Sequence, residues 1–309
     1  MNLPQSVTIV EVGPRDGLQN EPNTVPTEVK LEYIRLLAES GLSVIEATSF
    51  VSPKWVPQLA DAEQVMLQLP RREGLRYSVL VPNLKGLERA LQAGAQEVAI
   101  FTAASETFCQ RNLNRTIQQS LDEYAQVVRH AREANCRVRA YISTALVCPY
   151  EGDIAPEQVV PIVEQLMAMG VDEISLGDTI GAGVPTQVAR LTEAVLQKVP
   201  AHQIAYHFHN TYGTALANVL TALQMGITVF DSSAGGLGGC PFAPGATGNL
   251  ATEDLVYILH KMGIQTGVNL EAIVSAGRYI LGVLNRATPP SHYLQAISPC
   301  AVPKSADVW

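Results

Sequence analysis

Residues 156–176, PEQVVPIVEQLMAMGVDEISL, contain one complete unit of the pattern that decides the fold. Apolar residues three and four positions apart predict a helix from Pro156 to Met169. Gly170 is a typical helix-ending residue, and the short apolar run from Glu173 to Leu176 predicts a buried strand. The stretch therefore predicts a helix followed by a strand, as in proteins with parallel sheets.

The same unit repeats along the chain. Further strands are expected at 7–12, 44–48, 77–81, 98–101, 138–144, 204–208 and 228–230, and further helices near 27–40, 58–69, 84–93, 117–135, 185–199, 215–225 and 253–262. Four helices end at a glycine ahead of the next strand, at Gly41, Gly94, Gly170 and Gly226. Eight strand-then-helix units favour a closed (β/α)8 TIM barrel of the α/β class over an open doubly wound sheet, since no GxGxxG follows the first strand.

The remainder of the chain lies outside the eight units. An extra C-terminal helix is expected near Leu270 to Leu284, followed by an irregular tail to Trp309. This helix could pack on the barrel or form the interface of a homodimer. Because no linker or low-complexity segment divides the chain, residues 1–309 are expected to form a single catalytic domain, with the barrel at about 7–263 and a C-terminal helical extension at about 264–309.

Composition narrows the class of protein. A formal net charge of −8 disfavours nucleic acid or an anionic membrane as a partner, and no apolar run reaches the length of about 18 residues that a membrane span needs. The 5 cysteines are odd in number and include no CxxC pair, which predicts a reducing compartment, the cytoplasm. The start of the chain has neither the basic nor the apolar region of a signal peptide.

In a TIM barrel the site lies at the carboxyl ends of the strands, so the polar residues at these positions are the candidates. They are Arg15, Asp16, Gln19, Glu46, Thr48, Ser49, Ser175, Asp178, His207, His209, Asn210, Cys240 and Asn249. His207 and His209 are two apart on one strand, so both rings point to the same face, either as metal ligands or as hydrogen-bonded structural histidines. With Asp16 and Asn249 they would form a mixed nitrogen and oxygen site suited to Mg²⁺ or Mn²⁺, and less securely to Zn²⁺ or Co²⁺.

Two acidic residues lie inside apolar strands, where an unpaired carboxylate is costly. Arg15 is the expected partner of Glu46 and of Asp178, in structural ion pairs or in a site. Arg15 could instead bind a substrate carboxylate or enolate through its planar guanidinium group. Cys240 lies in a stretch rich in glycine, 231–249, which favours a reactive thiol over a small buried apolar residue.

Four segments carry a resemblance to a known family. They are VEVGPRDGLQNE at 10–21, SFVSPKWVPQ at 49–58, SLGDTIG at 175–181 and the cysteine loop at 236–249. The chain closely resembles the 3-hydroxy-3-methylglutaryl-CoA lyase family from about residue 7 to 285. The resemblance implies a TIM barrel with a divalent metal that cleaves the acyl-CoA substrate to acetyl-CoA and acetoacetate, as in leucine degradation and ketone body formation.

The resemblance also implies roles for single residues. Asp16, His207, His209 and Asn249 resemble the metal ligands; Cys240, Arg15, Asp178 and Glu46 the catalytic residues; and Arg15, Gln19, Ser49 and Ser175 the substrate-binding residues. In the retro-Claisen reaction Arg15 would stabilise the enolate and Cys240 would protonate it, while Asp178 or a group activated by the metal would be the base. Glycines 236, 238 and 239 would be the hinge of the loop that delivers Cys240.

The chain departs from the family at a few positions. Asn210 stands where the family usually has Asp. This change is expected to weaken the support that a carboxylate gives to the metal site, and such support can tune metal affinity. Thr144 and Val147 stand where Cys and Gly are frequent, which leaves a longer 3-hydroxy-3-alkylglutaryl-CoA open as substrate. A related condensing acyl-CoA synthase and an inactive binding protein are less favoured functions for the same chain. The synthase would need no cysteine loop, and the binding protein would be expected to have lost some of the four ligands.

Overall fold

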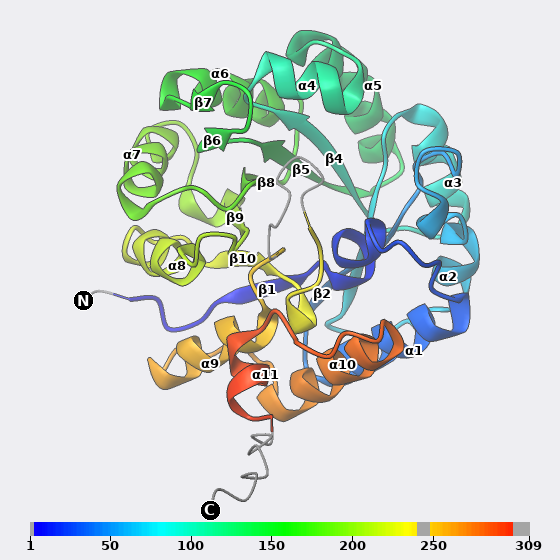
Figure 1. Ribbon diagram of the computed structural model, residues 1–309. Coiled ribbons are helices and arrows are strands. Elements are labelled where there is room, and N and C mark those ends of the chain that lie inside the picture. Colours follow the sequence, from blue (N-terminus) through cyan, green and yellow to red (C-terminus); the bar gives the residue numbers. More distant parts are fainter. Residues whose placement is uncertain (1–2, 240–247, 299–309) are drawn as a thin grey trace, which may run out of the picture.

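Eight parallel strands close into a barrel in a computed structural model that describes residues 3–239 and 248–298 (Figure 1). The strand order around the barrel is β1-β10-β9-β8-β5-β4-β3-β2, and β1 pairs with both β10 and β2. The barrel strands are β1 (Thr8–Glu11), β2 (Val44–Ser49), β3 (Arg76–Leu80), β4 (Glu97–Ala103), β5 (Arg137–Ser143), β8 (Glu173–Asp178), β9 (Ile204–Phe208) and β10 (Val229–Ser232). The predicted closed (β/α)8 barrel is confirmed, and the doubly wound sheet is wrong because the strands close on themselves.

Helices surround the barrel (Figure 1). They are α1 (Thr27–Glu39), α2 (Ala62–Gln68), α3 (Leu84–Gln92), α4 (Glu106–Leu113), α5 (Ile117–Glu133), α6 (Pro156–Ala168), α7 (Pro185–Leu196), α8 (Ala215–Gln224), α9 (Thr252–Lys261), α10 (Leu270–Val283) and α11 (His292–Ala296). The predicted glycine stops are confirmed, since all four have a positive φ, between 79° and 94° at Gly41, Gly94, Gly170 and Gly226.

Four elements differ from the sequence-based expectation. Helix α4 and the hairpin of β6 (Val147–Cys148) and β7 (Gly152–Asp153) were not predicted, and helix α11 lies in the tail that was expected to be irregular. The segment Gly13–Gly17 was expected to be a loop and instead forms one π-helical turn, in which three successive N–H groups, of Arg15, Asp16 and Gly17, point to the carbonyl oxygen of Val12. These elements are too short for a periodic apolar pattern to reveal them.

Side-chain alternation along the strands divides the interior into two layers. On β9, Tyr206 and Phe208 face the helices and stack on each other with ring centroids 4.9 Å apart. Ala205 belongs instead to a small apolar cluster within the barrel, with Val10 and Val229. His207 and Asp231 are register partners on β9 and β10, so their side chains lie on the same side of the sheet. The larger core lies between the sheet and the helices.

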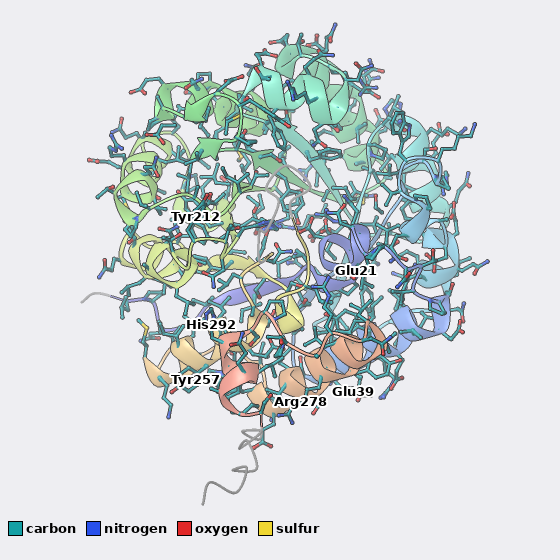
Figure 2. All side chains as sticks on the ribbon, in the orientation of Figure 1. Glu21, Glu39, Tyr212, Tyr257, Arg278 and His292 are labelled. Carbon is teal, nitrogen blue, oxygen red and sulfur yellow. The ribbon has the colours of Figure 1, made fainter. Side chains whose placement is uncertain are left out.

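The extra C-terminal helix packs on the barrel. Helix α10 contacts α1, α9 and the short turn η4 (Ala234–Gly236) that follows β10, and it lies beside α1 in Figure 1. Figure 2 labels one residue of each helix, Glu39 of α1 and Arg278 of α10. The same figure labels Glu21. Its carboxylate pairs at 2.5 Å with Arg286, which lies just beyond α10. Packing of this helix on the barrel is thus confirmed, and a homodimer stays a prediction.

Within the two described ranges, no helix is both long enough and apolar enough to cross a lipid bilayer.

Candidate metal site at the carboxyl ends of the strands

Barrel closure brings together four of the predicted residues from distant parts of the chain. Asp16 comes from the turn after β1, His207 and His209 from β9 and its end, and Asn249 from the segment before α9. The ligand atoms of Asp16, His207 and His209 lie within 4.8 Å of one another. The Nε2 atoms of the two histidines are 3.1 Å apart, and Oδ2 of Asp16 lies 3.9 Å from Nε2 of His207. The predicted orientation of both imidazoles to one face is confirmed.

Asn249 completes this cluster. Its Nδ2 atom donates hydrogen bonds to Oδ2 of Asp16 at 2.8 Å and to the carbonyl oxygen of Leu237 at 3.0 Å. Its Oδ1 atom is buried and has no hydrogen-bond partner among the described residues. A buried oxygen without a partner is costly unless a ligand satisfies it. One carboxylate, two imidazoles and this amide oxygen therefore fit a divalent metal ion.

The pKa shifts of Asp16 and His209 favour metal binding, whereas the pKa of His207 is raised: burial would lower it, but the hydrogen bond to Asp231 and the charges of Asp16 and Asp231 raise it. Burial would raise the pKa of Asp16, but the charges of Arg15, His207 and His209 and the hydrogen bond from Asn249 lower it to about 2. Burial and the neighbouring His207 charge lower the pKa of His209 to about 4. At neutral pH, Asp16 is therefore an anion and His209 a neutral imidazole with a free electron pair, the forms in which these residues bind metals.

Asp231, which the sequence analysis did not assign to the site, orients His207. Its Oδ2 atom lies 3.2 Å from Nδ1 of His207 and also accepts a hydrogen bond from Oγ of Ser175 at 2.9 Å. Arg139 holds the same carboxylate through Nη2 and Nη1, at 2.7 and 3.1 Å. When the Nδ1–H group of His207 donates a hydrogen bond to Asp231, the Nε2 atom of His207 is left to face the cluster. The signal in the sequence was a charged residue at the end of an apolar strand.

Arg15 is fixed beside the cluster by two carboxylates. Its Nε atom donates to Oε2 of Glu46 at 2.6 Å and its Nη1 atom to Oδ1 of Asp16 at 2.8 Å. Burial would lower the pKa of Arg15, but the charges of Glu46 and Asp16 hold it well above its usual value, so the guanidinium group stays charged. The ring of Tyr141 lies under it, with the centroid 5.6 Å from Cζ of Arg15.

The predicted partner of Asp178 is wrong. Glu46 pairs with Arg15 as expected, but Asp178 accepts hydrogen bonds from the backbone N–H groups of Ala182 and Gly183 at 3.0–3.1 Å. Burial raises the pKa of Asp178 to about 6 despite these bonds. Backbone donors of the turn after β8 therefore replace the cation that the sequence analysis expected.

A cavity of about 700 Å³ opens at this end of the barrel. Its wall includes Arg15, Asp16, Gln19, Val51, Ser52, Trp55, Phe108, Arg111, Arg115, Tyr141, Ser143, His207, His209 and Gly239. Ser49 and Ser175 are fully buried, and their hydroxyl groups already bond to the N–H of Val51 and to Asp231. They are not part of this wall as described, and their substrate contact stays a prediction.

Two departures from the family pattern have local explanations. The side chain at position 210 was expected to support the metal site. Oδ1 of Asn210 instead accepts a hydrogen bond from the N–H of Ala215 at the start of α8, at 3.2 Å. Thr144 has a positive φ of 53°, and its N–H donates to Oγ1 of Thr179 at 2.8 Å. Neither Thr144 nor Val147 lies in the described wall of the cavity, although Ser143 and Thr179, which adjoin Thr144, do.

The predicted hinge glycines differ in their surroundings. Cys240, the predicted thiol, lies outside the described residues. A Cβ atom at Gly238 would lie 2.5 Å from Nδ2 of Asn249, whereas at Gly239 no described atom lies within 4 Å. Substitution of Gly238 would thus disturb a candidate metal ligand directly, so metal affinity would respond as well as turnover. Gly239 is the position that tests backbone freedom without touching Asn249.

A closed (β/α)8 barrel with histidine, carboxylate and amide groups gathered at the carboxyl ends of its strands defines a TIM-barrel protein with a candidate divalent-metal site. The chain belongs to the HMGL-like family, whose model matches residues 6–280. The family predicted from the sequence is therefore confirmed.

Named relatives cover nearly the whole chain. The mitochondrial hydroxymethylglutaryl-CoA lyase of Bos taurus is 56% identical over 286 residues, covering 93% of this chain and 88% of the relative. The crystal structure of hydroxymethylglutaryl-CoA lyase from Pseudomonas aeruginosa is 51% identical with a TM-score of 0.94, covering 96% and 98% of the two chains. An HMG-CoA lyase from Acinetobacter baumannii, in complex with coenzyme A and 3-methylmalate, is 40% identical with a TM-score of 0.91, covering 96% and 97%. Relatives in this family carry both mitochondrial and cytoplasmic names.

Proposed function

We propose that the protein is a metal-dependent lyase that cleaves 3-hydroxy-3-methylglutaryl-CoA to acetyl-CoA and acetoacetate. The observation that carries the proposal is the convergence of Arg15 with Asp16, His207 and His209 on one wall of the 700 Å³ cavity. Relatives more than 50% identical carry the name of this lyase. We propose further that residues 1–309 act as one catalytic domain in the cytoplasm. The described cysteines, Cys109, Cys136 and Cys148, are free, which fits a reducing compartment.

Asp16, His207, His209 and Asn249 would hold Mg²⁺ or Mn²⁺. Such an ion, when bound, is a Lewis acid that makes the proton of a neighbouring hydroxyl group easier to remove. Asp231 contributes through its contact with Nδ1 of His207, which leaves Nε2 of His207 facing the site. Asp178 accepts the N–H groups of the turn after β8 and lies outside the described cavity wall, and it stays our candidate for the base that removes the hydroxyl proton.

Cleavage of the carbon–carbon bond leaves an enolate of acetyl-CoA, which needs both charge stabilisation and a proton. The Arg15 guanidinium group would bind the thioester oxygen, where negative charge develops. Glu46 and Asp16 hold this guanidinium in one orientation before the substrate arrives, which lowers the cost of reorganisation. Cys240 would protonate the enolate carbon. Gly239, the residue before it, lines the cavity and accepts a hydrogen bond from Nδ2 of Asn20 at 3.0 Å.

Coenzyme A would enter over the α4 side of the cavity. Arg111 and Arg115 belong to the described wall and are our candidates for its phosphates, and Trp55, 84% exposed, offers an aromatic surface at the rim. Lys54 and Lys85 are not part of the described wall. Arg111 is held over the ring of Tyr150, 4.2 Å from its centroid, which limits its motion.

A panel of 3-hydroxy-3-alkylglutaryl-CoA thioesters, assayed with Mg²⁺ or Mn²⁺ for release of acetyl-CoA, tests the proposal. We expect the methyl compound to have the highest kcat/KM, because relatives more than 50% identical are named for that substrate and neither Thr144 nor Val147 lies in the described cavity wall. A higher value for a longer alkyl group would transfer the assignment to that substrate. If no compound releases acetyl-CoA, the lyase is excluded, and condensation of acetyl-CoA with 2-oxo acids becomes the reaction to assay.

Replacing His209 with alanine is expected to lower the affinity for Mn²⁺ at least ~10-fold, because one imidazole nitrogen leaves the coordination sphere. Isothermal titration with Mn²⁺ and the metal content of the purified variant are the measurements. His130→Ala, in the last turn of α5, is the control and should keep full affinity. Unchanged affinity in His209→Ala would exclude His209 as a ligand.

A further inference from the structure

Two buried glutamates contact the backbone of the segment that follows β10. Glu11 is the last residue of β1, and Glu253 lies in the first turn of α9. Both are 0% exposed. Neither belongs to the candidate metal cluster or to the described cavity wall. Burial of two carboxylates at one place is costly, so their hydrogen bonds indicate what they stabilise.

Glu11 joins three segments that are far apart in the sequence. Its Oε1 atom accepts hydrogen bonds from the N–H of Gly13 at 2.8 Å and of Ala234 at 2.9 Å. Its Oε2 atom accepts one from Oγ1 of Thr252 at 2.6 Å. One carboxylate therefore ties the turn that carries Arg15 and Asp16 to the segment after β10 and to the start of α9.

Glu253 holds the next peptide group of the same segment. Both of its oxygens accept the N–H of Gly235, at 2.8 and 3.0 Å. Gly235 has a φ of 76°, a conformation that residues with a side chain rarely adopt. The hydroxyl group of Tyr33, on α1, lies 3.4 Å from the carbonyl oxygen of Ala234. Successive backbone groups at 234 and 235 are thus fixed by buried side chains.

The surroundings leave room for these carboxylates only because glycines line them. A Cβ atom on Gly13 would lie 2.4 Å from Oη of Tyr33 and 2.6 Å from Oε1 of Glu11. On Gly277, a residue of α10, it would lie 2.2 Å from Oε1 of Glu253. Any residue other than glycine at either position would therefore displace a carboxylate, so the arrangement depends on glycines in two separate elements, the turn after β1 and helix α10.

The segment held by the two glutamates is connected to Asn249. The N–H of Ser233 donates to the carbonyl oxygen of Leu250 at 3.0 Å, and Nδ2 of Asn249 donates to that of Leu237. Displacement of 233–237 would therefore move Asn249 relative to Asp16, whose own turn is held through Gly13.

We propose that Glu11 and Glu253 are positioning residues that keep Asp16 and Asn249 at the separation a metal ion requires, by fixing the backbone at Gly13, Ala234 and Gly235. The inference rests on the metal site of the proposed function. The two glutamates act through hydrogen-bond acceptance, not through contact with metal or substrate.

The experiment compares alanine and glutamine at both positions. Glu11→Ala and Glu253→Ala are expected to weaken Mn²⁺ binding ~10-fold or more in isothermal titration, and to speed amide hydrogen exchange at both 13–17 and 233–237. Glu11→Gln keeps an acceptor oxygen for Gly13 and Ala234, and its N–H group can donate to the Thr252 hydroxyl in the reverse direction, so its Mn²⁺ affinity should stay within about threefold of the wild-type value. Glu253→Gln likewise keeps one acceptor for Gly235.

The neighbouring Asp254 supplies a matched control. It is also a buried carboxylate in the first turn of α9, but it accepts hydrogen bonds from Ser291 and Tyr293 and so holds α11, where Figure 2 marks His292. Asp254→Ala should speed exchange in α11 and leave Mn²⁺ affinity unchanged.

Unchanged Mn²⁺ affinity and exchange in both alanine variants would overturn the inference, as would equal losses in the alanine and glutamine variants. If the alanine variants do not fold, a loss of more than ~10-fold in Glu11→Gln, with a wild-type melting temperature, would overturn it. Failure of the wild-type protein to bind Mn²⁺ would instead reject the proposed function. Amide hydrogen exchange at 13–17 in Glu253→Ala would still test whether the segments 13–17 and 233–237 are coupled.

The pH dependence of stability gives a second readout. Burial raises the pKa of Glu11 to about 7, and burial with the charges of Glu11 and Asp254 raises that of Glu253 to about 8, both from an ordinary 4.5. Tyr33, the other titratable group that faces the pair, has a pKa raised well above its ordinary value and stays neutral. Above pH 4.5 the folded state therefore binds more protons than the unfolded state. The free energy of unfolding that Glu11 and Glu253 contribute is fully present below pH 4.5 and is lost as the pH rises through 7 and 8. Glu253→Gln should show a smaller fall in melting temperature between pH 6 and 9 than the wild type, and an equal fall would contradict the buried ionisation.

Discussion

Replacing Arg15 with methionine is expected to lower kcat about 10²–10³-fold, the usual cost of removing one group that stabilises an enolate or oxyanion. The guanidinium group is the charged donor that Glu46 and Asp16 hold beside the candidate metal ligands. The expected loss falls on kcat more than on KM, because negative charge on the thioester oxygen develops only as the carbon–carbon bond breaks. Steady-state kinetics with hydroxymethylglutaryl-CoA measures it.

A structural explanation of that loss can be separated from a catalytic one. Methionine at position 15 leaves the Glu46 carboxylate, which is 0% exposed, without its cation, and an unpaired buried charge destabilises the fold. The double variant Arg15→Met with Glu46→Gln removes this charge and should recover melting temperature but not kcat. Recovery of kcat together with stability would show that Arg15 has only a structural role.

Replacing Cys240 with serine is expected to lower kcat about 10²–10⁴-fold, the range for loss of a general acid. A serine hydroxyl is a far weaker acid than a thiol and would protonate the enolate carbon slowly. Exchange of the methyl hydrogens of acetyl-CoA with D₂O, which runs the same proton transfer without cleavage, should fall in parallel.

Cys136→Ser is the matched control for this variant. Burial raises the pKa of the Cys136 thiol to about 12, so it is chemically inert, and turnover should stay at the wild-type level. Near wild-type turnover in Cys240→Ser would exclude Cys240 as the acid, and a residue of the described cavity wall would then have to donate the proton.

The barrel was predictable because each unit is encoded locally. A helix with an apolar face, a glycine at its end and a short apolar strand follow one another within about 25 residues, and each signal depends only on neighbours in the chain. The alternation of β9 also fixed which face His207 and His209 share, since successive side chains of a strand point to opposite sides. Helix α4 and the β6–β7 hairpin escaped prediction because they are too short to repeat the apolar pattern by which helices and strands are identified.

The partners of the buried charges were not predictable in the same way. Asp178 was expected to need a cation, but the turn that follows β8 supplies backbone N–H donors instead. Asp231, rather than the residue at position 210, supports His207, because strand pairing in the barrel places it in register with that histidine. Both outcomes depend on strand register and turn geometry, which involve residues far apart in the sequence.

The sequence by itself therefore determined the class of fold, the family and the residue types available at the carboxyl ends of the strands. Closure of β1 against β10 decided that Asp16 meets His207 and Asn249, and that Glu11 reaches the backbone at Ala234. The physical reason is that local apolar patterns select helices and strands, whereas hydrogen-bond partners of buried polar groups are selected only when the whole barrel excludes water from them.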